Sequence, residues 1–99
     1  MTHRVVFSPE ALLQLTKQQR YLAEKVSATF AAKHIEAIVV YCEGFATMPE
    51  RGTRHDEVRP GLRVVSRGRA DIAFVVGSDR VAILGVFFNG QDYEAVLGD

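Results

Sequence analysis

The side chains best suited to chemistry in this sequence are arginines gathered in one short stretch. Residues 51–69 hold six arginines against two carboxylates, Asp56 and Glu57, whereas residues 70–99 hold one arginine against five carboxylates. The first segment therefore carries a charge of +4 and the second −4, in a chain of 99 residues that is neutral overall. Planar guanidinium groups bind phosphates and carboxylates through paired hydrogen bonds. The stretch could thus bind a nucleic acid, bind an acidic protein partner, or stabilise its own fold.

The charge balance argues against a nucleic acid as the main partner. General nucleic-acid binders are usually basic over the whole domain. Here 12 basic and 12 acidic side chains give a pI of about 6.8. A local basic face for an acidic partner fits this pattern better. The alternative is that the basic and acidic segments face each other or are solvated separately.

RNA cleavage without a metal ion is another chemistry to weigh, since it needs cations on the phosphate together with a general acid and a base. Arg63, Arg67 and Arg69 could hold a phosphate, and Tyr93 could donate a proton. No base is evident, and no lysine follows Lys33. We therefore expect no catalytic residues, and keep ribonuclease activity as an alternative.

Metal binding has little support in the sequence. The three histidines share no ligand spacing, and adjacent loop residues such as His55, Asp56 and Glu57 rarely converge on one ion. Cys42, the single cysteine, lies on an apolar helical stripe without a basic neighbour, so we expect a core residue. The sequence predicts neither a metal nor a cofactor.

Length and composition predict one globular domain over residues 1–99. Hydrophobic residues make up 47% of the chain, as is ordinary for a folded domain. No apolar run approaches the ~18 residues that a membrane span needs, and no signal-peptide pattern begins the chain. A single cysteine excludes an internal disulfide, which suits a reducing compartment. We expect a cytoplasmic protein that does not contact a membrane.

The first half of the chain predicts a strand followed by two helices. Residues 3–7 form a short apolar run that ends at Ser8-Pro9-Glu10, a typical helix start. In the first helix, apolar residues recur at helical spacing: Leu12, Leu15, Leu22 and Val26. Ser27 then starts a second helix, whose apolar face steps by four and three residues: Ala31, Ile35, Ile38, Cys42 and Phe45. Two helices with so short a connection predict an antiparallel hairpin.

The second half predicts a loop and three strands. Residues 49–61 are punctuated by proline and glycine, and afterwards the period changes from helical to strand-like. We expect strands over residues 62–66, 70–76 and 81–88, and a helical turn around Tyr93. The fold class is therefore α+β: an N-terminal strand and an antiparallel helical hairpin packed on a mostly antiparallel sheet, which three C-terminal strands complete.

These pieces, in this order, resemble the ParE branch of the RelE/ParE toxins, the plasmid-stabilising toxins of bacterial toxin–antitoxin systems. The resemblance runs from about Val5 to Leu97. Its most specific block is Met48-Pro-Glu-Arg-Gly-Thr-Arg54 followed by Glu57-Val-Arg-Pro-Gly-Leu-Arg-Val64. Weaker matches support it: Phe7-Ser-Pro-Glu-Ala11, Tyr21-Leu-Ala-Glu24, Ile72-Ala-Phe-Val75 and Val81-Ala-Ile-Leu-Gly-Val-Phe-Phe88.

The resemblance implies a toxin that a ParD-like antitoxin neutralises by direct binding, in a hetero-oligomer with two copies of each chain or more. It implies DNA gyrase as the target, inhibited or poisoned without enzymatic activity of the toxin. Operator DNA would be reached only through the antitoxin. Two alternatives remain open: a RelE-like ribosome-dependent mRNA endonuclease, and a folded, non-toxic family member that only binds antitoxin.

One departure from the family bears on toxicity. Many relatives read Gly-Gly-Arg-Asp after the last strand, whereas this chain reads Asn89-Gly-Gln-Asp-Tyr93. The ribonuclease branch places an arginine near this point to stabilise charge on the phosphate, and Gln91 cannot supply a cation. This departure motivates the non-toxic alternative.

Seven residues are candidates for binding the antitoxin or the target: Arg59, Arg63, Arg67, Arg69, Gln91, Asp92 and Tyr93. We expect Arg59 and Arg63 either to anchor their loop to the fold or to meet the antitoxin. Arg67 and Arg69 are expected in a turn, where they are solvated or bind the partner, and Arg51 and Arg54 in loop structure and solvent. Strand alternation places Arg63 on the sheet face opposite the helices or at the rim.

Overall fold

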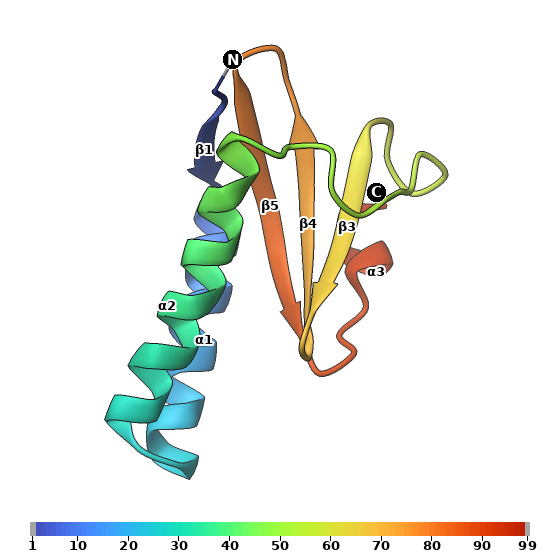
Figure 1. Ribbon diagram of the computed structural model, residues 1–99. Coiled ribbons are helices and arrows are strands. Elements are labelled where there is room, and N and C mark those ends of the chain that lie inside the picture. The colour runs from blue at the N-terminus through green and yellow to red at the C-terminus, as the bar shows by residue number, and fades with distance from the viewer. Residues whose placement is uncertain (1, 99) are drawn as a thin grey trace.

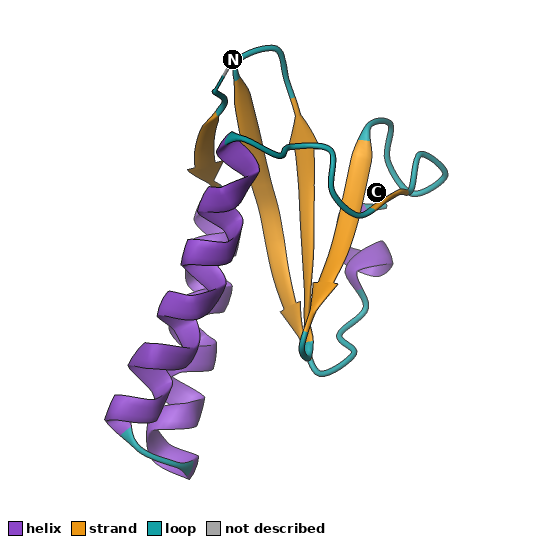
Figure 2. Ribbon diagram, in the orientation of Figure 1, coloured by secondary structure: helices purple, strands orange, loops and turns teal. Residues whose placement is uncertain are grey.

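The computed structural model describes residues 2–98 and consists of a five-stranded sheet with a helical hairpin against one face (Figure 1). The first half contains β1 (Arg4–Phe7), α1 (Pro9–Lys25), α2 (Ala28–Glu43) and a 3-10 turn at Gly44–Ala46. The second half contains β2 (Thr53–Arg54), β3 (Leu62–Arg67), β4 (Ala70–Val76), β5 (Arg80–Phe88) and the short helix α3 (Tyr93–Leu97). Figure 2 distinguishes the helices from the strands. Among residues 2–98, no helix is long and apolar enough to cross a membrane.

The sheet has the order β1-β5-β4-β3-β2, with β1 parallel to β5 and all other neighbours antiparallel. This arrangement confirms the predicted fold class. The prediction was wrong within residues 49–61, expected as a loop, because Thr53 and Arg54 pair with Val64 and Arg63 of β3. Two residues show no alternation that a pattern could reveal, so this strand depends on its pairing with β3.

Helix α1 begins at the predicted start because Ser8 both caps it and joins it to the sheet. The Ser8 hydroxyl accepts a hydrogen bond from the amide of Ala11 and donates one to the carbonyl of Leu84 in β5, each at 3.0 Å. Two turns into the helix, Gln14 Oε1 accepts a hydrogen bond from the amide of Val86 at 2.7 Å. These contacts fix the helix against β5 at two points.

The apolar stripe predicted for α1 is only partly correct. Leu15 is buried, but Leu12 and Val26 are 53% and 60% exposed. Because Gln14 faces β5, the helix is turned so that Ala11 and Leu15 form its buried face. The side of α1 that faces the sheet thus combines buried apolar residues with a polar side chain that bonds to β5.

Helix α2 presents the apolar face that the sequence predicts. Ser27 caps the helix by accepting a hydrogen bond from the amide of Phe30 at 3.0 Å. The predicted residues of this face are all buried: Ala31, Ile35, Ile38, Cys42 and, just beyond the helix, Phe45. The ring of Phe45 stacks on Phe74 of β4 with centroids 4.4 Å apart. This stack lies in the core between the hairpin and the sheet.

The sheet is apolar on both faces. On the hairpin face, Ile72 and Phe74 of β4 belong to the main core with α1 and α2. On the opposite face, a smaller cluster of Leu62, Val64, Ala73 and Phe87 is partly covered by Tyr93 and Leu97 of α3. We call these the hairpin face and the α3 face. The two-sided apolar pattern predicted for residues 70–76 is confirmed.

Candidate functional site

The seven predicted binding residues do not form one site. Arg63 lies on the hairpin face, because it pairs directly with Phe74 of the main core, and Arg67 shares that face by alternation. Tyr93 packs on the α3 face, against Phe87. The remaining candidates line hollows beside α1: Arg59, Arg69, Gln91 and Asp92.

The position of Arg63 corrects one alternative from the sequence. Val65, which shares its side of β3, packs against the hairpin core. Arg63 therefore lies on the same face of the sheet as the helices, and its predicted placement on the opposite face is wrong. The hairpin lies beside β1 and β5, and β3 lies beyond it at the rim of the hairpin face (Figure 1). Arg63 is accordingly half-buried, and Arg67 is exposed.

Two arginines lie over the ring of Tyr41 of α2 at this rim, and a third, Arg63, contacts one of them. The Cζ atom of Arg67 lies 4.7 Å from the centroid of the Tyr41 ring, and that of Arg51 lies 5.2 Å from it. Arg63 Nη1 donates a hydrogen bond to the carbonyl of Arg51 at 3.4 Å. Arg63 thus anchors the loop to the sheet, one of the two roles predicted for it. Arg51 packs on α2, whereas the sequence predicted only loop and solvent.

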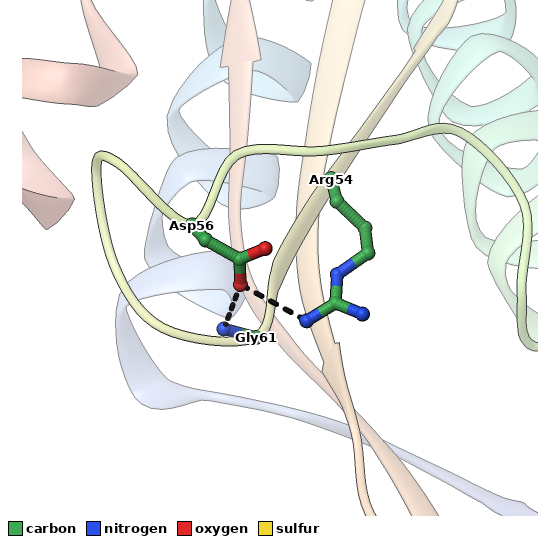
Figure 3. A network of polar contacts seen from close by, with 3 residues as sticks. All are labelled: Arg54, Asp56 and Gly61. Carbon is green, nitrogen blue, oxygen red and sulfur yellow. Dashed lines mark hydrogen bonds and ion pairs between the residues drawn. The ribbon is translucent and has the colours of Figure 1, made fainter.

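The loop before β3 is closed by a carboxylate (Figure 3). Asp56 Oδ1 accepts hydrogen bonds from the amide of Gly61 at 2.8 Å and from Arg54 Nη2 at 3.1 Å. The Gly61 amide, followed by Arg54, lowers the pKa of Asp56 below its ordinary value. Glu57 instead contacts His55, with 3.2 Å between Oε2 and Nδ1. These adjacent side chains serve the loop itself.

Tyr93 is enclosed on the α3 face. Its ring lies 6.1 Å from Phe87 and 5.9 Å from His55, measured between centroids. Burial raises the pKa of Tyr93 above its ordinary value, and nearby carboxylates, Glu94 first among them, raise it further. Arg63 and Arg67 lie on the other face of the sheet, so the structure separates the proposed proton donor from these two phosphate-binding candidates.

Gln91 and Asp92 shape the turn after β5. Gln91 Oε1 accepts a hydrogen bond from the amide of Phe88 at 2.9 Å. Asp92 caps α3, accepting hydrogen bonds from the amides of Glu94 and Ala95 at 3.1 and 3.2 Å. Both side chains therefore have a local structural task, and their part in binding a partner stays a prediction.

A groove follows α1 along the side that faces the end of β5. Its central hollow has a volume of about 500 Å³ and lies between Gln14, Gln18 and Tyr21 of α1 and Phe87 and Gln91. One neighbouring hollow continues it past Gln14 to Ser8 and Arg59, and another continues it past Tyr21 to Phe30 and Arg69. Several large apolar side chains at its edge are about half exposed or more: Tyr21, Phe30 and Val96. We call this the α1 groove.

Arg59 lines the α1 groove with an exposed side chain. It forms no ion pair with any residue in the described part of the chain. Its backbone holds the loop, since its carbonyl accepts a hydrogen bond from the amide of Leu62 at 3.0 Å and its amide donates one to the carbonyl of His55 at 3.2 Å. The role of its side chain stays a prediction.

Arg69 lies in the β3–β4 turn, as predicted, and its carbonyl accepts a hydrogen bond from the amide of Asn89 at 3.0 Å. The same prediction was wrong for Arg67, which ends β3 and pairs with Ala70 of β4.

The sequence did not reveal two residues that contribute to these surfaces. Tyr41 precedes Cys42 on α2 and lies outside the apolar stripe, so nothing local marks it as the centre of an arginine cluster. Gln14 sits at the α1 groove, and its only sequence signal was a polar residue between Leu13 and Leu15. Both depend on contacts with segments far along the chain.

Comparison with known proteins identifies what this chain is similar to. Residues 5–93 match the model of one family, the ParE toxin of type II toxin–antitoxin system, parDE. A solved structure described as the chromosomal ParDE TA system from P. aeruginosa superposes with a TM-score of 0.75 and 17% sequence identity, covering 88% of this chain and 96% of that chain. No curated protein matches. At this identity the structural likeness supports the fold, while the family match covers most of the sequence.

Proposed function

Because this chain belongs to the ParE toxin family of type II toxin–antitoxin systems, we propose that it inhibits or poisons DNA gyrase in the cytoplasm and is neutralised by direct binding of a ParD-like antitoxin. The family match over residues 5–93 is the observation that carries this proposal. The toxin would act by binding, without catalysing a reaction of its own.

The placement of the candidate residues supports a non-enzymatic action. Metal-free RNA cleavage needs a proton donor beside the cations that hold the phosphate. Arg63 and Arg67 lie on the hairpin face, whereas Tyr93 packs on the α3 face. Tyr93 also carries a raised pKa. This arrangement gives no support to the ribonuclease alternative.

The α1 groove is the surface we propose for the antitoxin. It joins a line of hollows to exposed apolar side chains such as Tyr21 and Val96. Exposed apolar groups beside a long groove favour a partner segment that folds as it binds, since such segments bury apolar area along an extended path. We expect a hetero-oligomer of two toxin and two antitoxin chains or more, with operator DNA contacted through the antitoxin.

The experiment is a supercoiling assay with the purified chain, DNA gyrase, ATP and relaxed plasmid. We expect lost supercoiling, or linear DNA after protein removal, in proportion to the amount of toxin. Protein unfolded by heat serves as the control. Unchanged supercoiling at a large excess of folded chain would contradict gyrase inhibition, and an mRNA cleavage assay with ribosomes then tests the enzymatic alternative.

A second candidate is a folded family member that binds antitoxin without being toxic. Gln91 favours it, since its uncharged side chain stands near the point where many relatives carry an arginine and is engaged with the amide of Phe88. In this case induced expression leaves growth unchanged, and Gln91→Arg produces growth arrest. Arrest by the unaltered chain would exclude this candidate.

A further inference from the structure

A cluster of cations at the rim of the hairpin face is separate from the α1 groove. It consists of Arg51 and Arg67 over the ring of Tyr41 and of Arg63, which is hydrogen-bonded to the carbonyl of Arg51, and we call it the Tyr41 arginine cluster. Arg51 comes from the loop after α2, Arg63 and Arg67 from β3, and Tyr41 from α2. Two segments of the chain therefore bring positive charges to one place, and a third supplies the aromatic ring.

None of the three arginines forms an ion pair within the described part of the chain, although Arg63 lies close enough to Asp56 to help lower the pKa of that carboxyl group. Among residues 2–98, ion pairs are formed by Arg54 with Asp56, His55 with Glu57 and Arg80 with Asp79. Glu43 and Glu50, the acidic residues nearest in sequence to Tyr41 and Arg51, form none with the cluster. Three like charges repel one another, so an acidic ligand would relieve a repulsion that the fold leaves in place.

Most guanidinium donors of the cluster have no hydrogen-bond partner within residues 2–98. Arg63 Nη1 reaches the carbonyl of Arg51 at 3.4 Å, and Arg51 Nη2 reaches Met48 Sδ at 3.4 Å. Each guanidinium carries five N–H donors in a fixed plane. Many donors therefore remain for a ligand with paired oxygen acceptors.

Tyr41 orders the cluster before any ligand arrives. A guanidinium over an aromatic ring is held by cation–π attraction, and both Arg51 and Arg67 are placed in this way. Tyr41 also lies in the last turn of α2, where the helix dipole presents its negative end to cations. Arginines held in position lose less conformational entropy when they bind.

The surroundings of Tyr41 distinguish between acidic ligands. Single-stranded nucleic acids need free aromatic faces on which bases stack. Here two guanidinium groups and the ring of Phe45, in a T-shaped arrangement with centroids 5.6 Å apart, already surround the Tyr41 ring. The chain is also neutral overall, unlike general nucleic-acid binders. Carboxylates fit better, because they accept paired hydrogen bonds from arginine without stacking.

We propose that the Tyr41 arginine cluster binds the carboxylate side chains of an acidic segment of a partner protein. This inference rests on the proposed function only in identifying that partner as the antitoxin. The rest of the antitoxin would then occupy the α1 groove. The cluster then supplies a second, charge-based contact on the hairpin face. Binding to the cluster should therefore weaken at high salt, because salt screens exposed charges.

The test is an NMR titration of the isotope-labelled chain with a capped hexaglutamate peptide, followed at the arginine Nε–H signals. We expect saturable shifts at Arg51, Arg63 and Arg67. Arg51→Gln and Arg67→Gln should each weaken peptide binding by about tenfold, since each removes charge-assisted hydrogen bonds. Arg20→Gln, which removes one exposed arginine from α1, should leave the affinity unchanged.

Tyr41→Leu tests whether the ring must hold the arginines in position, or whether their positive charge alone is enough for binding. It keeps all three cations but removes the ring, so we expect weaker peptide binding with a retained thermal transition. Tyr41→Phe keeps the ring and should restore the affinity. Both variants use a melting curve to exclude a loss of fold as the cause.

Three results would overturn the proposal. The first is an absence of saturable peptide shifts in the folded chain, and the second is an equal loss of affinity with Arg20→Gln. The third is tighter binding of an oligothymidine strand or of inorganic phosphate than of the peptide at the same signals. None of these measurements involves gyrase, so a negative supercoiling assay and a negative titration are separate outcomes.

Discussion

Gln91 accepts a hydrogen bond from the backbone amide of Phe88, with 2.9 Å between Oε1 and N, and this contact closes the turn after β5. The turn also needs left-handed backbone at Asn89 and Gly90, with φ of 56° and 79°. Gln91 stands near the point where many relatives carry an arginine, but in this fold its side chain accepts a hydrogen bond. Its replacement by arginine would change structure as well as charge.

Gln91→Arg should therefore lower the free energy of unfolding. Arginine has no acceptor atom, so the amide of Phe88 loses its partner, at an expected cost of about 1 kcal/mol. Urea denaturation measures the change. Gln91→Glu is the matched control, because it keeps an acceptor at the same reach and should remain close to the unaltered chain. Equal stability of Gln91→Arg and the unaltered chain would show that this hydrogen bond has little weight.

Gln14→Leu should destabilise the packing of α1 on β5. Gln14 Oε1 accepts from the amide of Val86 at 2.7 Å in a partly buried place, and leucine leaves that donor unpaired, at about 1–3 kcal/mol. Thermal or urea denaturation measures the loss. Gln19→Leu, at an exposed position of the same helix, is the control and should change stability little. If both variants behave alike, the contact with Val86 is not what fixes α1.

Asp56 should make stability depend on pH in the acidic range. Its folded-state pKa lies below the ordinary value of 3.8, because the Gly61 amide and Arg54 favour the ionised form. Its contribution is therefore fully present above about pH 4 and is lost as the pH falls through the lowered pKa. Asp56→Asn should melt below the unaltered chain near neutral pH and approach it in acid. A melting difference that stays constant down to pH 2 would contradict this linkage.

Local signals in the sequence account for much of the fold. Ser8 and Ser27 mark both helix starts, and the stepped apolar face of α2 predicts its buried side chains. β2 could not be predicted, because two residues become a strand only by pairing with β3. The face of α1 was misjudged for a related reason, since Gln14 bonds to an amide more than seventy positions away.

The arginines could be recognised from the sequence as a group, but their partners could not. Alternation along β3 gives the relative sides of Arg63 and Leu62, yet it does not say which side the hairpin covers or where that cover ends. The contact of Arg67 with Tyr41 depends on that boundary. The separation of Arg63 from Tyr93 is likewise a property of the whole sheet.

Cys42 provides a probe of how the core between hairpin and sheet opens. Burial, followed by the nearby carboxylate of Glu43, raises the pKa of its thiol to about 12. The thiolate is the reactive form, so a disulfide reagent at pH 8 should modify the folded chain very slowly. Added denaturant should expose the thiol, lower its pKa and raise the labelling rate in step with unfolding. Fast labelling of the folded chain without denaturant would mean that α2 separates from the sheet far more readily than its buried face implies.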